Sequence, residues 1–538
     1  MPMTRLRADF RVQAPRGRAA LLAAGLLALA PLSGAWGADA PRPRATLTTG
    51  VVEGTYPEGA PGAAFKGIPF AQPPVGPLRW HEPVAVKPWK GVRDASSLAP
   101  ACVQNGRNGV TGSEDCLYLN VWTPQKAAGG SHPVMLWFFG GGNVGGSASS
   151  PGFDGASLAR RGVVVVTANA RPGVMGFLAH PALTAESPHR SSGNYMLLDQ
   201  IATLRWIRDN IARFGGDPRN VTVFGQSSGS YDIPLLMTSP LARGLFSKAI
   251  AESGQFLAYN GPMPMARAES LGVQVAADLK APQGKGALAY LRSLPAEQVV
   301  ASAVKTLHTE PGTDTGLLTT VDGWVLPERP DKQFARGRQM PIPLLIGNNA
   351  REISPDYSPD ELRRQITAKY GDLAPRALAA YGLANGGSGS TDPMMGGAGA
   401  QWMTDVVQRC AANVETEWHA GAGFPTWRYQ FERSVPGREA VGATHGAEVA
   451  YVFGRLDRTG PDSPAYTEGD RKASDQIQAY WTRFAATGNP NGAGLPAWPA
   501  AKGGRYLAFT ADGPTPRENL QPGPCGVYRD WALRRLTR

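Results

Sequence analysis

The chain has 538 residues, of which 42% are hydrophobic and 18% are charged, with 66 Gly and 47 Pro. This composition excludes a disordered, collagen-like or coiled-coil protein and predicts a globular protein with a large core. The formal net charge is +11, but Lys and Arg are scattered and no run of five like charges occurs, so we expect no nucleic-acid partner. We interpret the charge as a solubility feature, with a slight bias toward anionic substrates as the second possibility.

The first 37 residues have the organisation of a signal peptide. Five Arg residues precede an uncharged apolar run at 19–32, and Ala35 and Gly37 then give the small-x-small pattern of a signal peptidase site. The apolar run is too short for a membrane span of about 20 residues, so we expect no stable membrane anchor. A disordered tail is the alternative. We expect export to the periplasm or secretion, and a single domain over 38–538 that keeps a charge of +7 after five Arg and one Asp are removed.

Four cysteines are present: Cys102, Cys116, Cys410 and Cys525. In an exported chain an oxidising compartment favours disulfides over thiols, so we expect two disulfides. Three pairings are possible. We favour Cys102 with Cys116 and Cys410 with Cys525, because the first two close a short loop and neither pair has the spacing of a zinc site.

Short runs of branched and aromatic residues predict buried strands at 134–139, 163–168, 221–224, 248–251, 343–347 and 427–431. Helical patterns lie between several of these runs, most clearly at 197–214 and 475–486. Strands that alternate with helices predict an α/β fold with a large, mostly parallel sheet covered on both faces. The segment 44–70 has Gly and Pro punctuation that predicts antiparallel edge strands before the main sheet.

Residues 385–400 are almost all small or turn-forming, and we expect a mobile loop there. A domain boundary is the alternative. We favour the loop because an apolar, helix-like pattern resumes at Trp402 and the candidate catalytic residues lie on both sides.

The predicted strand 221–224 runs directly into Gly225-Gln226-Ser227-Ser228-Gly229, the only G-x-S-x-G sequence of the chain. In a nucleophile elbow the serine occupies a strained turn between strand and helix, where flanking glycines remove Cβ atoms that would clash. The N-terminus of the following helix also favours a negative oxygen. Ser227 is therefore the candidate nucleophile, and an ordinary Gly/Ser turn is the alternative. We expect Pro234 to distort the helix that follows.

A serine nucleophile needs a base within hydrogen-bond reach and a carboxylate behind that base. Of the seven histidines, His445 is the candidate because it lies in a loop-like stretch before a predicted helix. Glu352 follows the strand 343–347 at its C-terminal end, where α/β sheets build their sites, and is the candidate acid, with Asp356 as the alternative. The order Ser227, Glu352, His445 matches that of the α/β-hydrolases.

Three consecutive glycines, Gly140, Gly141 and Gly142, follow the predicted strand 134–139. Their N–H groups can approach a substrate oxygen closely because no Cβ atoms intervene. We expect the N–H groups of Gly141, Gly142 and Ser228 to form an oxyanion hole. A flexible turn is the alternative.

Nearly the whole chain after the N-terminal segment resembles the type B carboxylesterases, the family that includes cholinesterases and fungal lipases. Besides the G-x-S-x-G motif, similar motifs lie at 65–71, 114–121, 214–218, 252–254 and 488–491. The family's G-x-N-x-x-E pattern is met at Glu352 and its H-G-x-E pattern at His445. The resemblance implies an α/β-hydrolase fold and a serine carboxylesterase that forms an acyl-enzyme. It also implies a small-molecule ester as the partner, and neither a metal nor an organic cofactor.

Three departures from the family pattern bear on the substrate pocket. Phe139 stands where His or Tyr is usual, Asn143 where an aromatic residue is usual, and Gln226 where Glu is usual. Without Glu at position 226, we expect no buried negative charge near His445. We expect Asn143 to place an amide beside the acyl site, which reduces the gain from apolar burial of a long acyl chain.

The predicted Cys102–Cys116 loop also bears on the substrate. Residues 103–115 include no Trp for a choline ammonium group and are too few for a long lipase lid. We therefore expect short or polar acyl groups to be favoured. The alternatives are a lipase or an amidase that uses the same triad, or a catalytically silent adhesion protein of the family.

Overall fold

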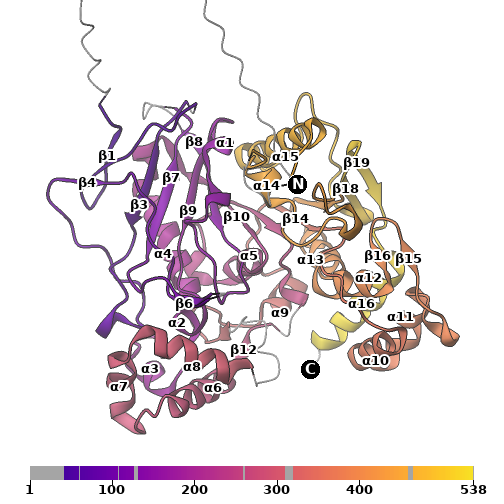
Figure 1. The fold of residues 1–538 in the computed structure, drawn as a ribbon, viewed down its shortest axis with the longest axis horizontal. Helices are drawn as coiled ribbons and strands as arrows, with labels where there is room; N and C mark the ends of the chain where they lie inside the picture. Colours follow the sequence, from indigo (N-terminus) through magenta and orange to yellow (C-terminus); the bar gives the residue numbers. More distant parts are fainter. Residues whose placement is uncertain are drawn as a thin grey trace, which may run out of the picture. The chain divides into compact units, whose positions relative to one another are not determined.

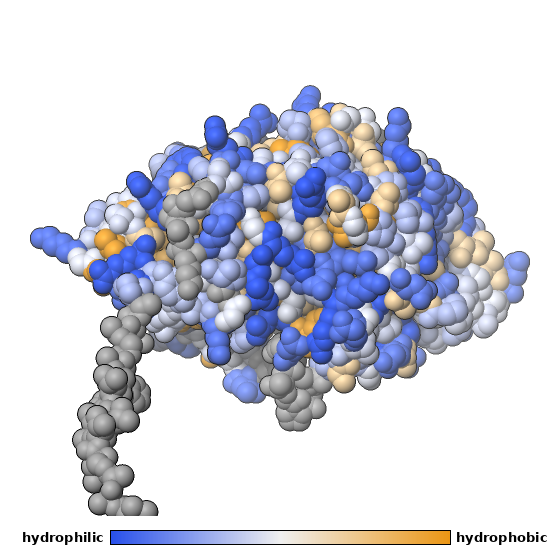
Figure 2. Space-filling model, turned by 90° about the horizontal axis from the view of Figure 1, so that it is seen from above, coloured by the Kyte–Doolittle hydropathy of each residue, from blue (hydrophilic) through white to orange (hydrophobic). Residues whose placement is uncertain are grey.

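The fold is taken from a computed structural model, which describes residues 41–59, 61–106, 108–125, 131–258, 261–308, 319–457 and 464–536 (Figure 1). The predicted signal peptide at 1–37 lies outside these residues. Arg42–Arg538 group into one compact unit. Within the described ranges, no helix is both long enough and apolar enough to cross a membrane. The face seen from above is covered mainly by hydrophilic residues, with apolar residues in small separate patches (Figure 2).

The described residues form a ten-stranded main sheet in the order β19-β18-β17-β14-β11-β10-β8-β9-β7-β3. Neighbours from β18 to β9 are parallel, whereas β19, β7 and β3 pair antiparallel at the two edges. The predicted α/β class is confirmed. The strands are β3 (Ala64–Pro69), β7 (Tyr118–Trp122), β8 (His132–Phe138), β9 (Val164–Ala168), β10 (Gly216–Gln226), β11 (Lys248–Glu252), β14 (Leu344–Asn349), β17 (Thr426–Phe431), β18 (Arg505–Thr510) and β19 (Gly513–Glu518).

Smaller sheets accompany the main one. Antiparallel β1 (Arg44–Thr46) and β2 (Val51–Glu53) with β4 (Val92–Asp94) form a three-stranded sheet. Together with β3 at the edge of the main sheet, they confirm the antiparallel strands expected at 44–70. The two-stranded pairs are β5 (Gln104–Gly106) with β6 (Gly109–Thr111), β12 (Met263–Pro264) with β13 (Thr320–Val321), and β15 (Thr391–Asp392) with β16 (Gly396–Gly397).

Each face of the main sheet packs into its own hydrophobic core. On β8, Leu136 and Phe138 belong to one core, and Met135 and Trp137 belong to the other. This division follows from the alternation of side chains along a strand. Because both faces are covered, the central strands read in the sequence as continuous apolar runs.

Helices cover both faces of the sheet (Figure 1). The core of Leu136 includes side chains from α4 (Tyr195–Asn210), α5 (Ser228–Thr238), α13 (Cys410–Gly421) and α16 (Pro522–Leu536). The core of Trp137 includes side chains from α1 (Ala156–Ala159), α14 (Val449–Val452) and α15 (Glu468–Thr487). The other helices are α2 (Gly173–Phe177), α3 (Pro181–Glu186), α6 (Met265–Asp278), α7 (Ala287–Ser293), α8 (Ala296–His308), α9 (Pro330–Ala335), α10 (Pro359–Tyr370), α11 (Ala374–Ala380) and α12 (Ala398–Thr404).

One local expectation from the sequence is wrong. The segment 385–400 is not a featureless loop, because it contains the β15–β16 hairpin and the first turn of α12. Its small residues permit close packing: a Cβ atom on Gly389 would lie 2.8 Å from that of Ala398. Helix α5 continues through Pro234 without a break.

Candidate active site

Ser227 lies on the turn between β10 and α5, as the sequence predicted. Its φ of 57° and ψ of −127° are rare for a residue with a side chain, and its N–H donates to the Glu252 carbonyl at 2.9 Å. A Cβ atom on Gly225 would lie 2.8 Å from the Gly229 carbonyl, and one on Gly229 would lie 2.1 Å from the Phe138 carbonyl. The two glycines of the motif are therefore required by the close approach of β8, β10 and α5.

The three predicted triad residues meet at the C-terminal edge of the sheet. Nδ1 of His445 lies 2.7 Å from Glu352 Oε2, and its Nε2 lies 2.8 Å from Ser227 Oγ. Because an ionised carboxylate only accepts hydrogen bonds, Nδ1 carries the proton and donates to Glu352, which leaves Nε2 free to accept from Ser227. This is the geometry that a nucleophile, a base and an orienting acid would require.

The pKa of His445 lies above its ordinary value of 6.5. Burial alone lowers this pKa, but the hydrogen bond and the charge of Glu352, followed by the charge of Glu448, outweigh burial and raise it. The imidazole remains 35% exposed, whereas the Glu352 side chain is fully buried.

Contrary to the sequence expectation, a buried carboxyl lies near His445 even though residue 226 is Gln. It belongs to Glu448, which is 2% exposed and accepts a hydrogen bond from Asn349 Nδ2 at 2.5 Å. Burial, followed by the charge of Glu352, raises the pKa of Glu448 to about 7. The H-G-x-E pattern contained this residue, but the sequence could not show that α14 turns it inward.

The loop that carries Glu352 is held by groups that the sequence analysis missed. The Glu352 N–H donates to Thr404 Oγ1 at 3.1 Å, and its Oε1 accepts from the Asn349 N–H at 2.6 Å. One turn further, a π-helix at Asp405–Arg409 directs the Arg409 guanidinium to the Ala350 carbonyl. A π-helix is a frequent feature of functional sites, but nothing in the local sequence marked this one.

The glycine loop after β8 lies against the nucleophile. A Cβ atom on Gly140 would lie 2.8 Å from Ser227 Cβ, and Gly141 and Gly142 have φ values of 134° and 65°. Within the described residues, the N–H groups of these last two glycines donate no hydrogen bond to the protein. Ser228 begins α5, where an N–H has no partner inside the helix. The N–H groups of Gly141, Gly142 and Ser228 thus have no acceptor within the described residues.

The three departures from the family pattern lie in different surroundings. Gln226 is 8% exposed, and its Nε2 lies 3.2 Å from His445 Nε2, so it contacts the triad. Phe139 is 3% exposed and packs in the core of Trp137. Asn143 has no exposed surface, because its amide is turned to Asp232 on α5. The amide of Asn143 therefore does not line an open acyl site, contrary to the sequence expectation.

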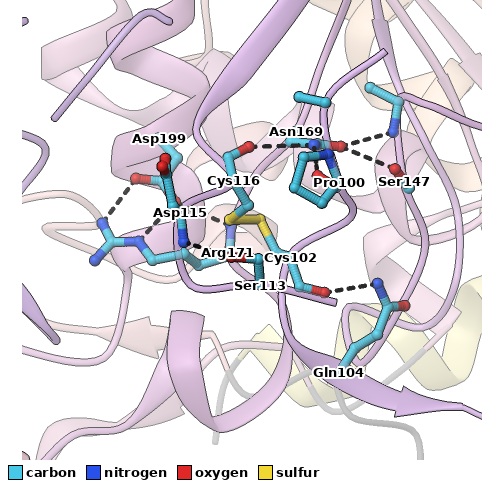
Figure 3. The surroundings of a disulfide bond; sticks show 12 residues. Pro100, Cys102, Gln104, Ser113, Asp115, Cys116, Ser147, Asn169, Arg171 and Asp199 are labelled. Carbon is cyan, nitrogen blue, oxygen red and sulfur yellow. Dashed lines mark hydrogen bonds and ion pairs between the residues drawn. A yellow bond between two sulfur atoms is a disulfide. The ribbon is translucent and has the colours of Figure 1, made fainter. Parts of the chain in front are cut away.

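Both disulfides have the predicted pairing, Cys102–Cys116 and Cys410–Cys525. Beside the first one, Gln104 Nε2 donates to the Cys102 carbonyl (Figure 3). Gln104 Nε2 also donates to the Gly146 carbonyl, and Gln104 Oε1 accepts from the Gly146 N–H at 2.5 Å. Asn169 donates to the Cys116 carbonyl and accepts from Ser147. The disulfide loop thus supports the far end of the glycine loop.

The fold and the site define the class of an α/β-hydrolase esterase, and the comparisons with known proteins agree. The model of the carboxylesterase family matches residues 41–526. A fumonisin B1 esterase of Sphingopyxis macrogoltabida is 36% identical over 91% of this chain and 90% of its own, and carboxylesterase 4A of Bos taurus is 35% identical over 89% and 93%. A solved PNB esterase, 32% identical, superposes with a TM-score of 0.76 over 91% of this chain and 100% of its own. The chain belongs to the carboxylesterase family, and it is a hydrolase of carboxylic esters.

Proposed function

We propose that the chain is an exported serine carboxylesterase that works through an acyl-enzyme, with Ser227 as nucleophile, His445 as base and Glu352 as orienting acid. The observation that carries the proposal is the continuous line of hydrogen bonds from Glu352 through His445 to Ser227, at 2.7 and 2.8 Å. A catalytically silent member of the family would have no need of this line.

Each residue has one task in the reaction. His445 Nε2 removes the proton of Ser227 as Oγ attacks the ester carbonyl, and Glu352 stabilises the imidazolium that forms. The negative oxygen of the tetrahedral intermediate accepts hydrogen bonds from the N–H groups of Gly141, Gly142 and Ser228. His445 then returns the proton to the leaving alcohol. Water attacks the acyl-enzyme by the same path and releases the acid.

The test is Ser227→Ala, with Ser230→Ala as the matched control. Ser230 is a buried serine on α5, the helix that follows Ser227, and its Oγ donates to the Gly254 carbonyl at 3.2 Å. Loss of a triad member should lower kcat by about 10³- to 10⁶-fold and abolish labelling by an organophosphonate, whereas the control should retain both. Turnover above about a tenth of wild type in Ser227→Ala would contradict the assignment.

For the substrate, we propose esters with short or polar acyl groups. The relative from Sphingopyxis macrogoltabida is named a fumonisin B1 esterase. The 103–115 loop is short, and Gln104 binds it to Gly146 by a hydrogen bond. Both features support the absence of a long lid in that loop. p-Nitrophenyl acetate or butyrate should give a higher kcat/KM than the palmitate ester. A rate that jumps only above the solubility limit of a long-chain ester would favour the lipase alternative, and faster cleavage of an anilide than of the matching ester would favour an amidase.

We also propose that 1–37 is a signal peptide and 38–538 one mature domain, delivered to the periplasm or secreted. The two disulfides support passage through an oxidising compartment. N-terminal sequencing of the exported protein should begin at Ala38. Retention of the segment in an exported, active protein would contradict the proposal.

A further inference from the structure

Helix α5 carries a buried carboxyl one turn beyond the nucleophile. Asp232 has no exposed surface, and no Lys, Arg or His of the described chain forms an ion pair with it. Two amides bind it instead: Asn143 Nδ2 donates to Oδ1 at 3.0 Å, and Gln200 Nε2 from α4 donates to Oδ2 at 2.6 Å. Such a group is costly to bury, since an unpaired carboxylate loses its hydration.

The partner Asn143 directly follows Gly142, one of the proposed oxyanion donors. Its φ of 60° is left-handed, a conformation that Asn adopts more readily than most residues. Its carbonyl accepts from the Gly173 N–H at 2.6 Å while its amide is bound to Asp232. The end of the glycine pair is therefore fixed on both its main-chain and its side-chain groups.

Apolar side chains could hold α5, α4 and the glycine loop together at a lower desolvation cost than Asp232, Gln200 and Asn143 do. The amide oxygens of Asn143 and Gln200 are both buried without a hydrogen-bond partner within the described chain. A buried polar contact contributes direction rather than net stability, because a hydrogen bond is formed in only one relative orientation of its partners.

We propose that Asp232 is a positioning residue for the oxyanion hole: through Asn143 it holds the Gly141–Gly142 loop in register with the nucleophile helix. Helix α5 supplies the Ser228 N–H and begins beside Ser227 Oγ, so the contact joins all three donors and the nucleophile into one unit. The inference rests on the proposed function, because it assigns a task to a loop that stabilises the oxyanion.

The first test removes the contact from either side. Asn143→Gly keeps the left-handed backbone without the amide, and Asp232→Ala removes the carboxyl. Each should lower kcat by about 10- to 100-fold, the effect of a misplacement of up to about 1 Å, while KM changes less than about threefold. Affinity for a trifluoromethyl ketone, whose adduct with Ser227 carries an oxyanion, should fall in parallel with kcat.

The second test exchanges the partners. Asn143→Asp alone places two carboxyls about 3.0 Å apart and should be the slowest variant. Combined with Asp232→Asn it restores the pair, because the new amide donates to the new carboxylate and its oxygen still accepts from Gln200. The double variant should recover kcat to within about threefold of wild type. Since it preserves side-chain volume, it decides the question even if Asp232→Ala does not fold.

Tyr231→Phe is the matched control, since it removes a buried hydroxyl of the same helix that pairs with Thr319 at 3.1 Å. Its kcat should stay within about twofold of wild type. Wild-type kcat and ketone affinity in Asn143→Gly, or a double variant no better than Asn143→Asp, would overturn the inference. Retained turnover in Ser227→Ala would instead overturn the proposed function, so the two failures are distinguishable.

Discussion

Replacing Gln226 with Glu should shift the pH profile of the esterase to higher pH. Nε2 of His445 must be unprotonated to accept the proton of Ser227, so kcat/KM rises with pH as the imidazolium loses its proton. The pKa of His445 is raised above 6.5. The rise of kcat/KM with pH should therefore have its midpoint above pH 6.5 in the wild-type chain, and activity should be lost as the pH falls through this midpoint.

The size of the shift follows from the geometry. Gln226 Nε2 lies 3.2 Å from His445 Nε2, and a carboxylate at that distance attracts an imidazolium by about 5 kcal/mol at an effective dielectric of 20 and by about 1 kcal/mol in water. The imidazole is 35% exposed, so the effective interaction lies between these limits, at roughly 1.5 to 3 kcal/mol. This corresponds to an increase of about 1 to 2 in the apparent pKa.

The assay is kcat/KM for a short-chain ester, followed as acid release from about pH 5 to 9. Gln226→Met is the control, because it removes the amide without adding a charge. Its midpoint should stay within about 0.3 of wild type, while that of Gln226→Glu rises. Equal midpoints in the Glu and Met variants would refute the electrostatic reasoning.

Three further predictions concern groups around the triad. Gln104→Leu removes both hydrogen bonds to Gly146 and should lower kcat by roughly tenfold at nearly constant KM. An unchanged kcat would show that the disulfide loop does not support the glycine loop during catalysis. Thr404→Val should lower kcat by about tenfold or more, while Thr404→Ser, which keeps the acceptor for the Glu352 N–H, should remain near wild type; equal rates in the two variants would contradict this role. Burial raises the pKa of Asp232 to about 7, so this carboxyl makes the folded state less stable as the pH rises from about 4 to about 7. Asp232→Asn should therefore raise the melting temperature relative to wild type above pH 7 and not at about pH 4, as measured by scanning calorimetry; an equal difference at both pH values would contradict the assignment.

The parts of the site that the sequence could predict are those with a local signature. A strand that runs into two glycines around Ser227 specifies the elbow, because a Cβ atom at either glycine position would lie within 2.8 Å of neighbouring backbone. Glu352 follows from its place after the C-terminal end of a strand, and His445 from its loop before a helix. The order of Ser227, Glu352 and His445 along the chain supports both. The predicted strands of the main sheet were correct because they too have a local signature: burial on both faces leaves an unbroken apolar run in the sequence.

The parts that could not be predicted depend on contacts between distant segments. Asn143 and Asp232 are 89 positions apart, and neither has a neighbour in the sequence that indicates the other. The inward orientation of Glu448 and the reach of Arg409 to Ala350 depend on how α14 and the π-helix pack. Residues 385–400 show the opposite error: small side chains suggest freedom, but they also allow the backbone segments to approach closely.

These contacts explain how an irregular set of loops can hold catalytic geometry. The sheet fixes only the ends of its strands, and both the glycine loop and the acid loop extend beyond it. Each loop accepts a hydrogen bond from, or donates one to, a polar side chain that lies next to a disulfide. Gln104, two residues after Cys102, binds Gly146, and Arg409, immediately before Cys410, binds Ala350. A hydrogen bond fixes direction but yields when its donor moves, whereas a disulfide limits how far that donor can move. The disulfides therefore hold the backbone beside Gln104 and Arg409, and the hydrogen bonds of these side chains pass that constraint to the two loops. These are the loops where the proposed oxyanion hole and the proposed acid must keep their positions.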